Sequence, residues 1–234
     1  MVAPLLAIET ATRRCSVALA EGGAVLAHRE EESERLTHAE RLNVFIDEVL
    51  REAGVDITAL AGVAVGVGPG SYTGLRIGLS AAKGLCYALG IPLMGMGSLD
   101  VLVHELRAQG VVLPAGARLM PMIDARRMEV FTQVSAPGGD RETAPHPLVL
   151  DEAWAASLPK DRTTVVFGDG ADKAAGLLAG IPGVLHVSGV RPAHRGMVSL
   201  SFELFARGAF SDLAYLVPDY GKPANVTQPK RAAS

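Results

Sequence analysis

The segment from Gly62 to Gly90 limits the fold of this chain more than any other part of the sequence. It starts with a valine-rich run, 62–67, of the kind that forms a buried strand. A glycine-rich loop, 68–74, follows, and an apolar helix then runs to about residue 89, where Gly90 provides a stop signal. A strand that passes through a glycine loop into a helix is typical of turn-rich α/β and α+β folds.

The loop 68–74 is a candidate binding site for an anion or a nucleotide. Backbone N–H groups in front of a helix can hold an anion, because they point toward it and the helix dipole favours negative charge. The loop has neither the Gly-Lys-Ser/Thr ending of a P-loop nor the dinucleotide fingerprint, so a purely structural turn is the alternative. The candidate loop residues are Gly68, Gly70, Ser71, Tyr72 and Thr73.

Small residues recur at every fourth position of the helix that follows the loop. Each internal glycine costs about 1 kcal/mol relative to alanine, so close approach of another backbone is expected as compensation. That backbone belongs either to the same chain or to a partner subunit. In the second case we expect an interface between this helix and the preceding helix, 37–53, which carries apolar residues on one face. The predicted interface residues are Leu42, Phe45, Ile46, Val49, Gly74, Arg76, Gly78 and Ala82.

The remaining signals of the first half predict strands and capped helices. Strands are expected at 5–8, 15–20 and 24–30, with Gly22-Gly23 as a hairpin turn and the acidic stretch 30–34 as a solvated loop. Thr37 and Glu40 match a capping box at the start of helix 37–53. A strand at 93–96 precedes a third helix, 98–108, with Ser98 as its cap.

The second half contains further strand and helix signals. Paired strands are expected at 119–123 and 128–135 around the turn 124–127, and a helix of about 171–179 follows Gly168-Asp169-Gly170. The stretch 109–116, with its glycines and proline, separates the halves. We therefore predict an N-terminal lobe with the glycine loop and partner helices at 1–109, a C-terminal lobe at 110–218 and a flexible tail at 219–234.

Composition and charge exclude several classes of protein. With 49% apolar and 20% charged residues, the chain is not a disordered protein. Its net charge of −3 argues against independent RNA binding, which usually needs a basic surface. Cys15 and Cys86 are expected to be buried, reduced thiols. The longest apolar run, about ten residues, is too short for a membrane span. No signal-peptide pattern is present, so we expect a cytoplasmic protein.

The histidines do not form a metal-binding motif. No two of the 6 histidines lie three or four residues apart, and none neighbours a cysteine. We therefore expect surface or capping roles for them, and predict no metal site and no cofactor. A Gly-x-Ser-x-Gly nucleophile elbow is also absent from the sequence.

Four sequence motifs together resemble the TsaB family, also called YeaZ. They are Leu6-Ala7-Ile8-Glu9-Thr10-Ala11-Thr12, Cys15-Ser16-Val17-Ala18-Leu19, Gly68-Pro69-Gly70-Ser71-Tyr72-Thr73-Gly74-Leu75-Arg76-Ile77-Gly78, and Ile123-Asp124-Ala125-Arg126. The resemblance implies an α/β fold of the actin-like and sugar-kinase-like ATPase type, which is ribonuclease H-like. Such a fold has two lobes, each a mixed sheet with flanking helices.

The resemblance also implies a non-catalytic role in making the threonylcarbamoyl modification of tRNA adenosine beside the anticodon. The related catalytic subunit, TsaD, carries a His-x-x-x-His metal pair, and the matching positions here are Ser98 and Leu102. Glu9 stands where phosphate-binding relatives have aspartate, and no glycine-containing turn follows it. Both departures predict a subunit without catalytic residues.

The implied partners are proteins of the same modification complex. Family members bind TsaD, and one another, through the first two helices, so we expect a TsaD-like catalytic subunit as partner and a homodimer when the chain is alone. A TsaE-like ATPase is expected to dock on the pair, with tRNA bound only indirectly through the complex. Two alternatives are open: an ATP-dependent small-molecule kinase of the same fold, and a glycoprotease-like metallopeptidase.

Overall fold

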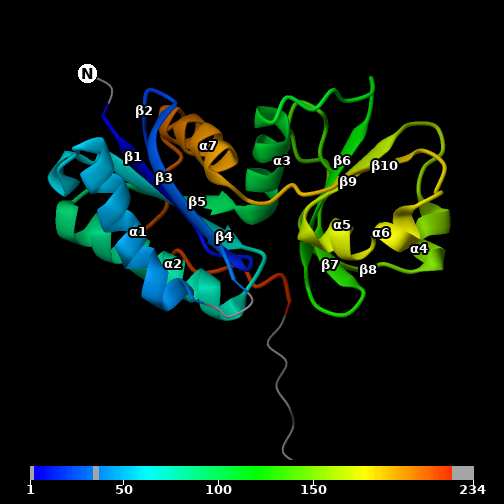
Figure 1. Cartoon of the computed structure of the whole chain (residues 1–234), viewed down its shortest axis with the longest axis horizontal. Helices are drawn as coiled ribbons and strands as arrows, with labels where there is room; N and C mark the ends of the chain where they lie inside the picture. Colours follow the sequence, from blue (N-terminus) through cyan, green and yellow to red (C-terminus); the bar gives the residue numbers. More distant parts are fainter. Residues whose placement is uncertain (1–2, 34–36, 223–234) are drawn as a thin grey trace, which may run out of the picture.

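The computed structural model describes residues 3–33 and 37–222, which form two lobes side by side (Figure 1). The first lobe contains a five-stranded sheet of order β3-β2-β1-β4-β5. β1 pairs antiparallel with β2 and parallel with β4, so the sheet is mixed. Its strands are β1 Leu5–Glu9, β2 Arg14–Glu21, β3 Ala24–Glu32, β4 Gly62–Gly68 and β5 Leu93–Gly97.

The second lobe contains another mixed five-stranded sheet, of order β10-β9-β6-β7-β8. β6 runs parallel to β9 and antiparallel to β7, which confirms the strand pair expected around the turn 124–127. Its strands are β6 Arg118–Asp124, β7 Glu129–Thr132, β8 His146–Val149, β9 Thr164–Phe167 and β10 Val184–Val187.

Helices cover both faces of the first sheet. Alternate residues of a strand point to opposite faces, so in β1 Leu6 and Ile8 pack on one side while Leu5 and Ala7 pack on the other. α1 (His38–Ala53) and α2 (Tyr72–Leu89) cover the first side, with the short 3₁₀ helix η1 (Ile57–Ala59) between them in sequence. α7 (His194–Ala206) covers the second side (Figure 1).

The second sheet is covered in the same alternating way. Leu119 and Ile123 of β6 pack with α3 (Ser98–Ala108), while Met120 and Met122 face α5 (Asp169–Lys173) and α6 (Ala175–Leu178). α4 (Glu152–Ser157) also lies on that outer side, where Trp154 packs against the buried cluster. α3 therefore stands between the two lobes, in contact with both α7 and β6.

Several local predictions are confirmed. Gly22 and Gly23 form the turn between β2 and β3 with φ of 60° and 84°, the left-handed values that favour glycine. Helices α1 and α2 end at Gly54 and Gly90, which both adopt the left-handed conformation of a C-cap. Cys15 and Cys86 are buried and unpaired with one another.

None of the helices in 3–33 and 37–222 has the length and apolar character that crossing a bilayer requires.

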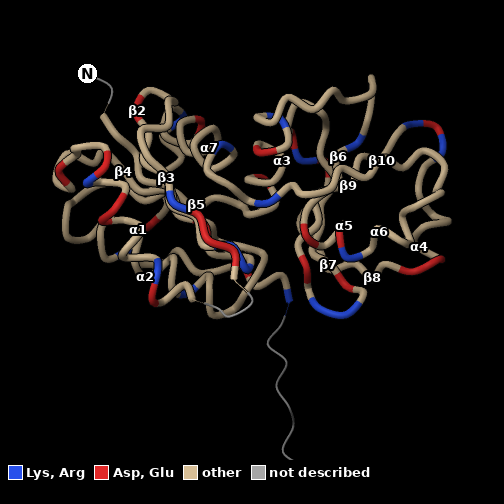
Figure 2. The backbone as a smooth tube through the Cα atoms, in the orientation of Figure 1, with Lys and Arg blue, Asp and Glu red and all other residues tan. Residues whose placement is uncertain are grey.

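The predicted cap at Ser98 and the predicted acidic loop are wrong, and the predicted cap at Thr37 is confirmed in position only. Thr37 is the N-cap residue of α1, but its side chain makes no capping bond, and its hydroxyl donates to Glu31 Oε1 at 3.2 Å. Gly97, not Ser98, is the N-cap position of α3. The acidic stretch continues β3 as far as Glu32 (Figure 2), since its carboxylates have partners such as Arg14 in β2 and Arg191. The helix expected at 171–179 is interrupted at Ala174 and forms α5 and α6.

The predicted C-terminal lobe, 110–218, needs correction in its last part. Met197 and Val198 of α7 join Leu5 and Ala7 in one buried cluster, although α7 follows the second sheet in sequence. Ser211, beyond α7, forms a bridge with Leu93 at the edge of β5. α7 and the segment that follows it as far as Ser211 therefore pack with the first lobe.

The predicted flexible tail, 219–234, begins with an ordered segment. The backbone N–H of Asp219 donates to the carbonyl of Val67 in the first lobe at 2.7 Å. Lys222 forms an ion pair with Glu129 of β7 in the second lobe. Residues 219–222 thus contact both lobes, whereas 223–234 lie outside the described residues.

Candidate functional site

The glycine loop lies at the carboxyl end of β4, beside the end of β1. It forms hydrogen bonds within itself and to the residues that follow β1. The Ser71 N–H donates to the carbonyl of Ala11 at 2.7 Å, and Ser71 Oγ accepts from the Gly74 N–H at 3.2 Å. An added Cβ at Gly70 would overlap Ala11, and one at Gly68 would overlap the carbonyl of Asp219. These contacts give Gly68, Gly70 and Ser71 structural roles. Anion binding by the loop, with its exposed Tyr72 and Thr73, stays a prediction.

The carboxylate of Glu9 fills the space where β1 and β4 end. It is 0% exposed, and its Oε1 accepts from the Thr10 and Ala11 N–H groups, both at 2.8 Å. Its Oε2 accepts from Ser98 Oγ at 2.9 Å. A Cβ at Gly66 would overlap this carboxylate, so the glycine in β4 is required for it to fit. The site is thus closed by the protein's own acidic side chain.

Burial makes Glu9 sensitive to pH. Removal from water disfavours the charged form and raises the pKa of the Glu9 carboxyl above 4.5. For an acid whose pKa is higher in the folded state, stability is greatest below the unfolded-state pKa. It is lost as pH rises from about 4.5 through the folded-state pKa.

We therefore expect Glu9→Gln to gain stability relative to the wild type as pH rises from about 4.5. The glutamine stays neutral, its oxygen can accept the two backbone bonds, and its amide can donate to Ser98 Oγ. Urea unfolding at a series of pH values measures the difference. Glu9→Ala is the control, and it should lose more than about 2 kcal/mol throughout, because three donors lose their acceptor. A constant difference between wild type and Glu9→Gln across the series would contradict the prediction.

Neither position that matches the TsaD histidine pair faces an open site. Ser98 and Leu102 are both 0% exposed. Ser98 is bonded to Glu9, and Leu102 packs with the second sheet. The hydrogen bond between Glu9 and Ser98 links two residues that sequence reasoning had treated separately.

The stripe of small residues on α2 packs within the chain, as the alternative interpretation held. Thr10 Oγ1 donates to the Gly74 carbonyl at 2.8 Å, and a Cβ at Gly74 or Gly78 would overlap atoms of Thr10. Ala82 is 0% exposed in the same core. The predicted use of Gly74, Gly78 and Ala82 as contact residues for a partner needs correction, because the end of β1 already occupies their surface.

The apolar residues predicted for the interface are also internal. Their exposed fractions are at most 6%, and all belong to the core that α1 forms with the first sheet: Leu42, Phe45, Ile46 and Val49. Arg76 is the exposed member of the predicted set. Its Nε donates to Tyr220 Oη at 2.8 Å, and its guanidinium lies 4.0 Å from the Tyr72 ring centre. Arg76 therefore holds the ordered segment 219–222 against α2.

The outer side of α2 has features that the sequence reasoning did not use. Tyr87 is 83% exposed, and beside it Gly84 is exposed with no atom within 4 Å of an added Cβ. An open groove of about 510 Å³ lies there between α2 and the segment after α7. Its lining residues are Lys83, Gly84, Tyr87, Leu213 and Ala214. The sequence signal that could have pointed to this surface was Gly84 itself, a glycine within a helix that does not belong to the four-residue repeat of small residues.

Sequence comparisons agree with the resemblance. The family model described as tRNA N6-adenosine threonylcarbamoyltransferase, TsaD, matches residues 29–149, just over half of the chain. The Escherichia coli K12 protein named tRNA threonylcarbamoyladenosine biosynthesis protein TsaB is 39% identical over 128 residues, 54% of this chain and 52% of that protein. The match thus spans about half of that relative's length. The Bacillus subtilis 168 protein of the same name is 28% identical and aligns over 92% of this chain and 93% of its own length.

Structural comparisons agree as well. YeaZ from Pseudomonas aeruginosa superposes with a TM-score of 0.77 at 28% identity, over 93% of this chain and 99% of that chain. An inorganic polyphosphate/ATP-glucomannokinase from Arthrobacter sp. strain KM superposes with a TM-score of 0.54 at 14% identity, over 88% of this chain and 99% of that chain. This similarity concerns the fold alone. The fold is that of the actin-like ATPases, with two mixed sheets and flanking helices. Family model, full-length relative and YeaZ structure together place the chain in the TsaB/YeaZ family.

Proposed function

We propose that this chain is the non-catalytic scaffold subunit of a tRNA threonylcarbamoyladenosine-modifying complex. It binds a TsaD-like catalytic subunit and activates it for threonylcarbamoyl transfer to tRNA adenosine beside the anticodon. The names of the relatives support the pathway. The buried Glu9 carboxylate, which fills the place where β1 and β4 end, supports a role without nucleotide chemistry.

The observation that carries the proposal is Gly84 on the outer side of α2. An exposed helical glycine costs about 1 kcal/mol relative to alanine, and the neighbours of Gly84 leave open space around it. The close approach of a partner helix is a physical reason for retaining it. Val44 of α1 and Tyr87 of α2 are exposed on the same pair of packed helices, and aromatic residues are enriched at interfaces. The contact surface is therefore the outer side of α1 and α2, in place of their buried residues.

The same surface serves for a homodimer when the catalytic subunit is absent. A TsaE-like ATPase then docks on the heterodimer, and tRNA is held through the complex. The net charge of −3 is consistent with a subunit that leaves phosphate contacts to its partners.

Co-purification with the host's TsaD-like protein tests the proposal. We expect a stable complex from full-length proteins, and we expect tRNA modification by the reconstituted system to fall when this chain is omitted. The control omits the TsaD-like protein, which should abolish modification. Undiminished modification without this chain, or failure to form the complex, would rule out the scaffold role.

A kinase is the second candidate, because an ATP-using enzyme shares the fold. Glu9 argues against it, since its buried side chain occupies the space at the ends of β1 and β4. Calorimetric titration of the isolated chain with Mg-ATP decides between the two. Binding with turnover would favour the kinase.

A further inference from the structure

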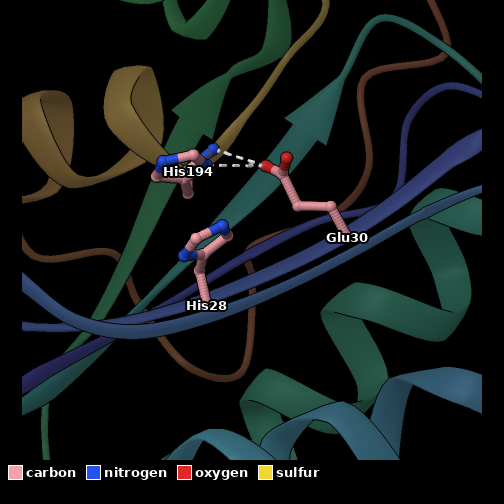
Figure 3. Close-up of side chains that lie close together, drawn as sticks. All are labelled: His28, Glu30 and His194. Atoms are coloured by element: carbon pink, nitrogen blue, oxygen red, sulfur yellow. Dashed lines mark hydrogen bonds and ion pairs between the residues drawn. The ribbon is translucent and has the colours of Figure 1, made fainter.

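Two histidines and a glutamate from distant parts of the chain meet at the edge of the first sheet. His28 and Glu30 belong to β3, and His194 is the first residue of α7. Figure 3 shows the two imidazole rings with the Glu30 carboxylate beside them. The rings are stacked, with their centroids 3.8 Å apart. One ligand atom from each residue can be chosen so that all three lie within 4.8 Å of one another.

The local structure explains why these side chains converge. Residues two apart in a strand point to the same face, so His28 and Glu30 both face α7. The backbone N–H of His194 donates to Glu30 Oε1 at 2.7 Å, which fixes the start of α7 above β3. His194 Nδ1 lies 3.2 Å from the same oxygen. The ligand atoms are thus held by the backbone of both elements.

We propose that His28, Glu30 and His194 form a binding site for a divalent transition-metal ion, with Zn²⁺ the best match. Two imidazoles and one carboxylate are a donor set that zinc accepts, at bond lengths of about 2.0–2.2 Å, with a fourth position open to water. The candidate ligand atoms lie within 4.8 Å of one another, and the two imidazoles would rotate out of their stacked arrangement to direct one nitrogen each at the ion.

Second contacts hold the carboxylate in place. Ser16 Oγ donates to Glu30 Oε1 at 2.8 Å, and Arg14 Nη1 lies 3.5 Å from Oε2. Such outer partners orient metal ligands and tune affinity. Oε1 accepts from Ser16 Oγ and from the His194 N–H, whereas Oε2 faces Arg14, so an ion bound at Oε2 would displace the Arg14 contact. The bound metal links α7 to the edge strand β3, and its role is structural.

No metal site was predicted from the sequence because no two histidines lie three or four residues apart, a spacing that detects only ligands on a single helix. Here the ligands come from a strand and from a helix start 164 residues further along the chain. The site is independent of the proposed partner surface, because α1 and α2 lie on the other side of the sheet.

Titration of the chelator-treated full-length chain with ZnCl₂, followed by calorimetry, tests the site. We expect one ion per chain and a higher melting temperature with zinc, since a ligand that binds the folded state stabilises it. His28→Gln should weaken binding by more than about 100-fold, and Ser16→Ala by about tenfold. Co²⁺ bound at the site should show tetrahedral absorption without a thiolate-to-metal band, which excludes the cysteines.

His146→Gln is the matched control, because His146 is an exposed histidine of β8 in the other lobe. It should leave zinc affinity unchanged. His28 is itself exposed, so His28→Gln should remain folded by circular dichroism. Absence of zinc binding by the wild-type chain, or equal binding by folded His28→Gln, would overturn the proposal.

Discussion

Replacing Gly84 with arginine is expected to abolish capture of the TsaD-like subunit while the chain stays folded. Nothing lies within 4 Å of a Cβ at this position, so the new side chain fits in the isolated protein. In the complex it would place a long, charged group between closely packed helices. An unpaired buried charge costs about 3–5 kcal/mol, so we expect affinity to fall by more than about 100-fold. Surface plasmon resonance with the purified subunit measures this change.

Two further variants make the result specific. Gly84→Ala should make the chain about 0.5–1 kcal/mol more stable to unfolding, since alanine is the better helix former, and should weaken binding less than Gly84→Arg does, because it adds only one methyl group. Gly176→Arg is the matched control in α6 of the other lobe, where a Cβ also meets open space. It should bind the subunit as the wild type does. If Gly84→Arg retained full affinity, α2 would not be the contact surface.

Gly78→Leu is expected to damage the fold itself. A Cβ at Gly78 would overlap Oγ1 of the buried Thr10, and leucine adds three more carbon atoms. Overpacking a core costs about 1–3 kcal/mol or more, and here α2 must also move away from β1. We expect a loss of at least about 3 kcal/mol, measured by urea unfolding.

Gly84→Leu carries the same substitution at a helical glycine six positions along α2 and should unfold like the wild type. Loss of partner binding by Gly78→Leu would therefore report misfolding. A Gly78→Leu protein as stable as wild type would show that the contact with Thr10 can relax.

Sequence patterns predicted the helices and strands better than the tertiary contacts that these elements make. The period of apolar residues in α1, the valine run of β4 and the stop glycine at 90 each reflect local backbone preferences, so those elements were predicted. The prediction of a loop at the acidic end of β3 was wrong, because this part of the strand is stabilised by cations from elsewhere in the chain, such as Arg191. Tertiary partners of this kind leave no mark on the strand's own sequence.

The candidate site shows the same division. Periodicity identified the apolar face of α1 and the small residues of α2, but it cannot say whether a face meets the same chain or another one. The structure assigns Phe45 and Gly78 to the internal core and leaves Gly84 outside. The pairing of His28 with His194 was beyond sequence reasoning, since it depends on α7 returning to the first sheet.

The return of α7 has a consequence for biosynthesis. Leu5 and Ala7 leave the ribosome before the second sheet is made, yet their covering residues, Met197 and Val198, follow the whole of that sheet in sequence. During translation one face of the nascent first sheet therefore has no cover, while strands β6–β10 and their helices can already assemble. The first lobe can therefore be completed only after the strands of the second lobe have been synthesised.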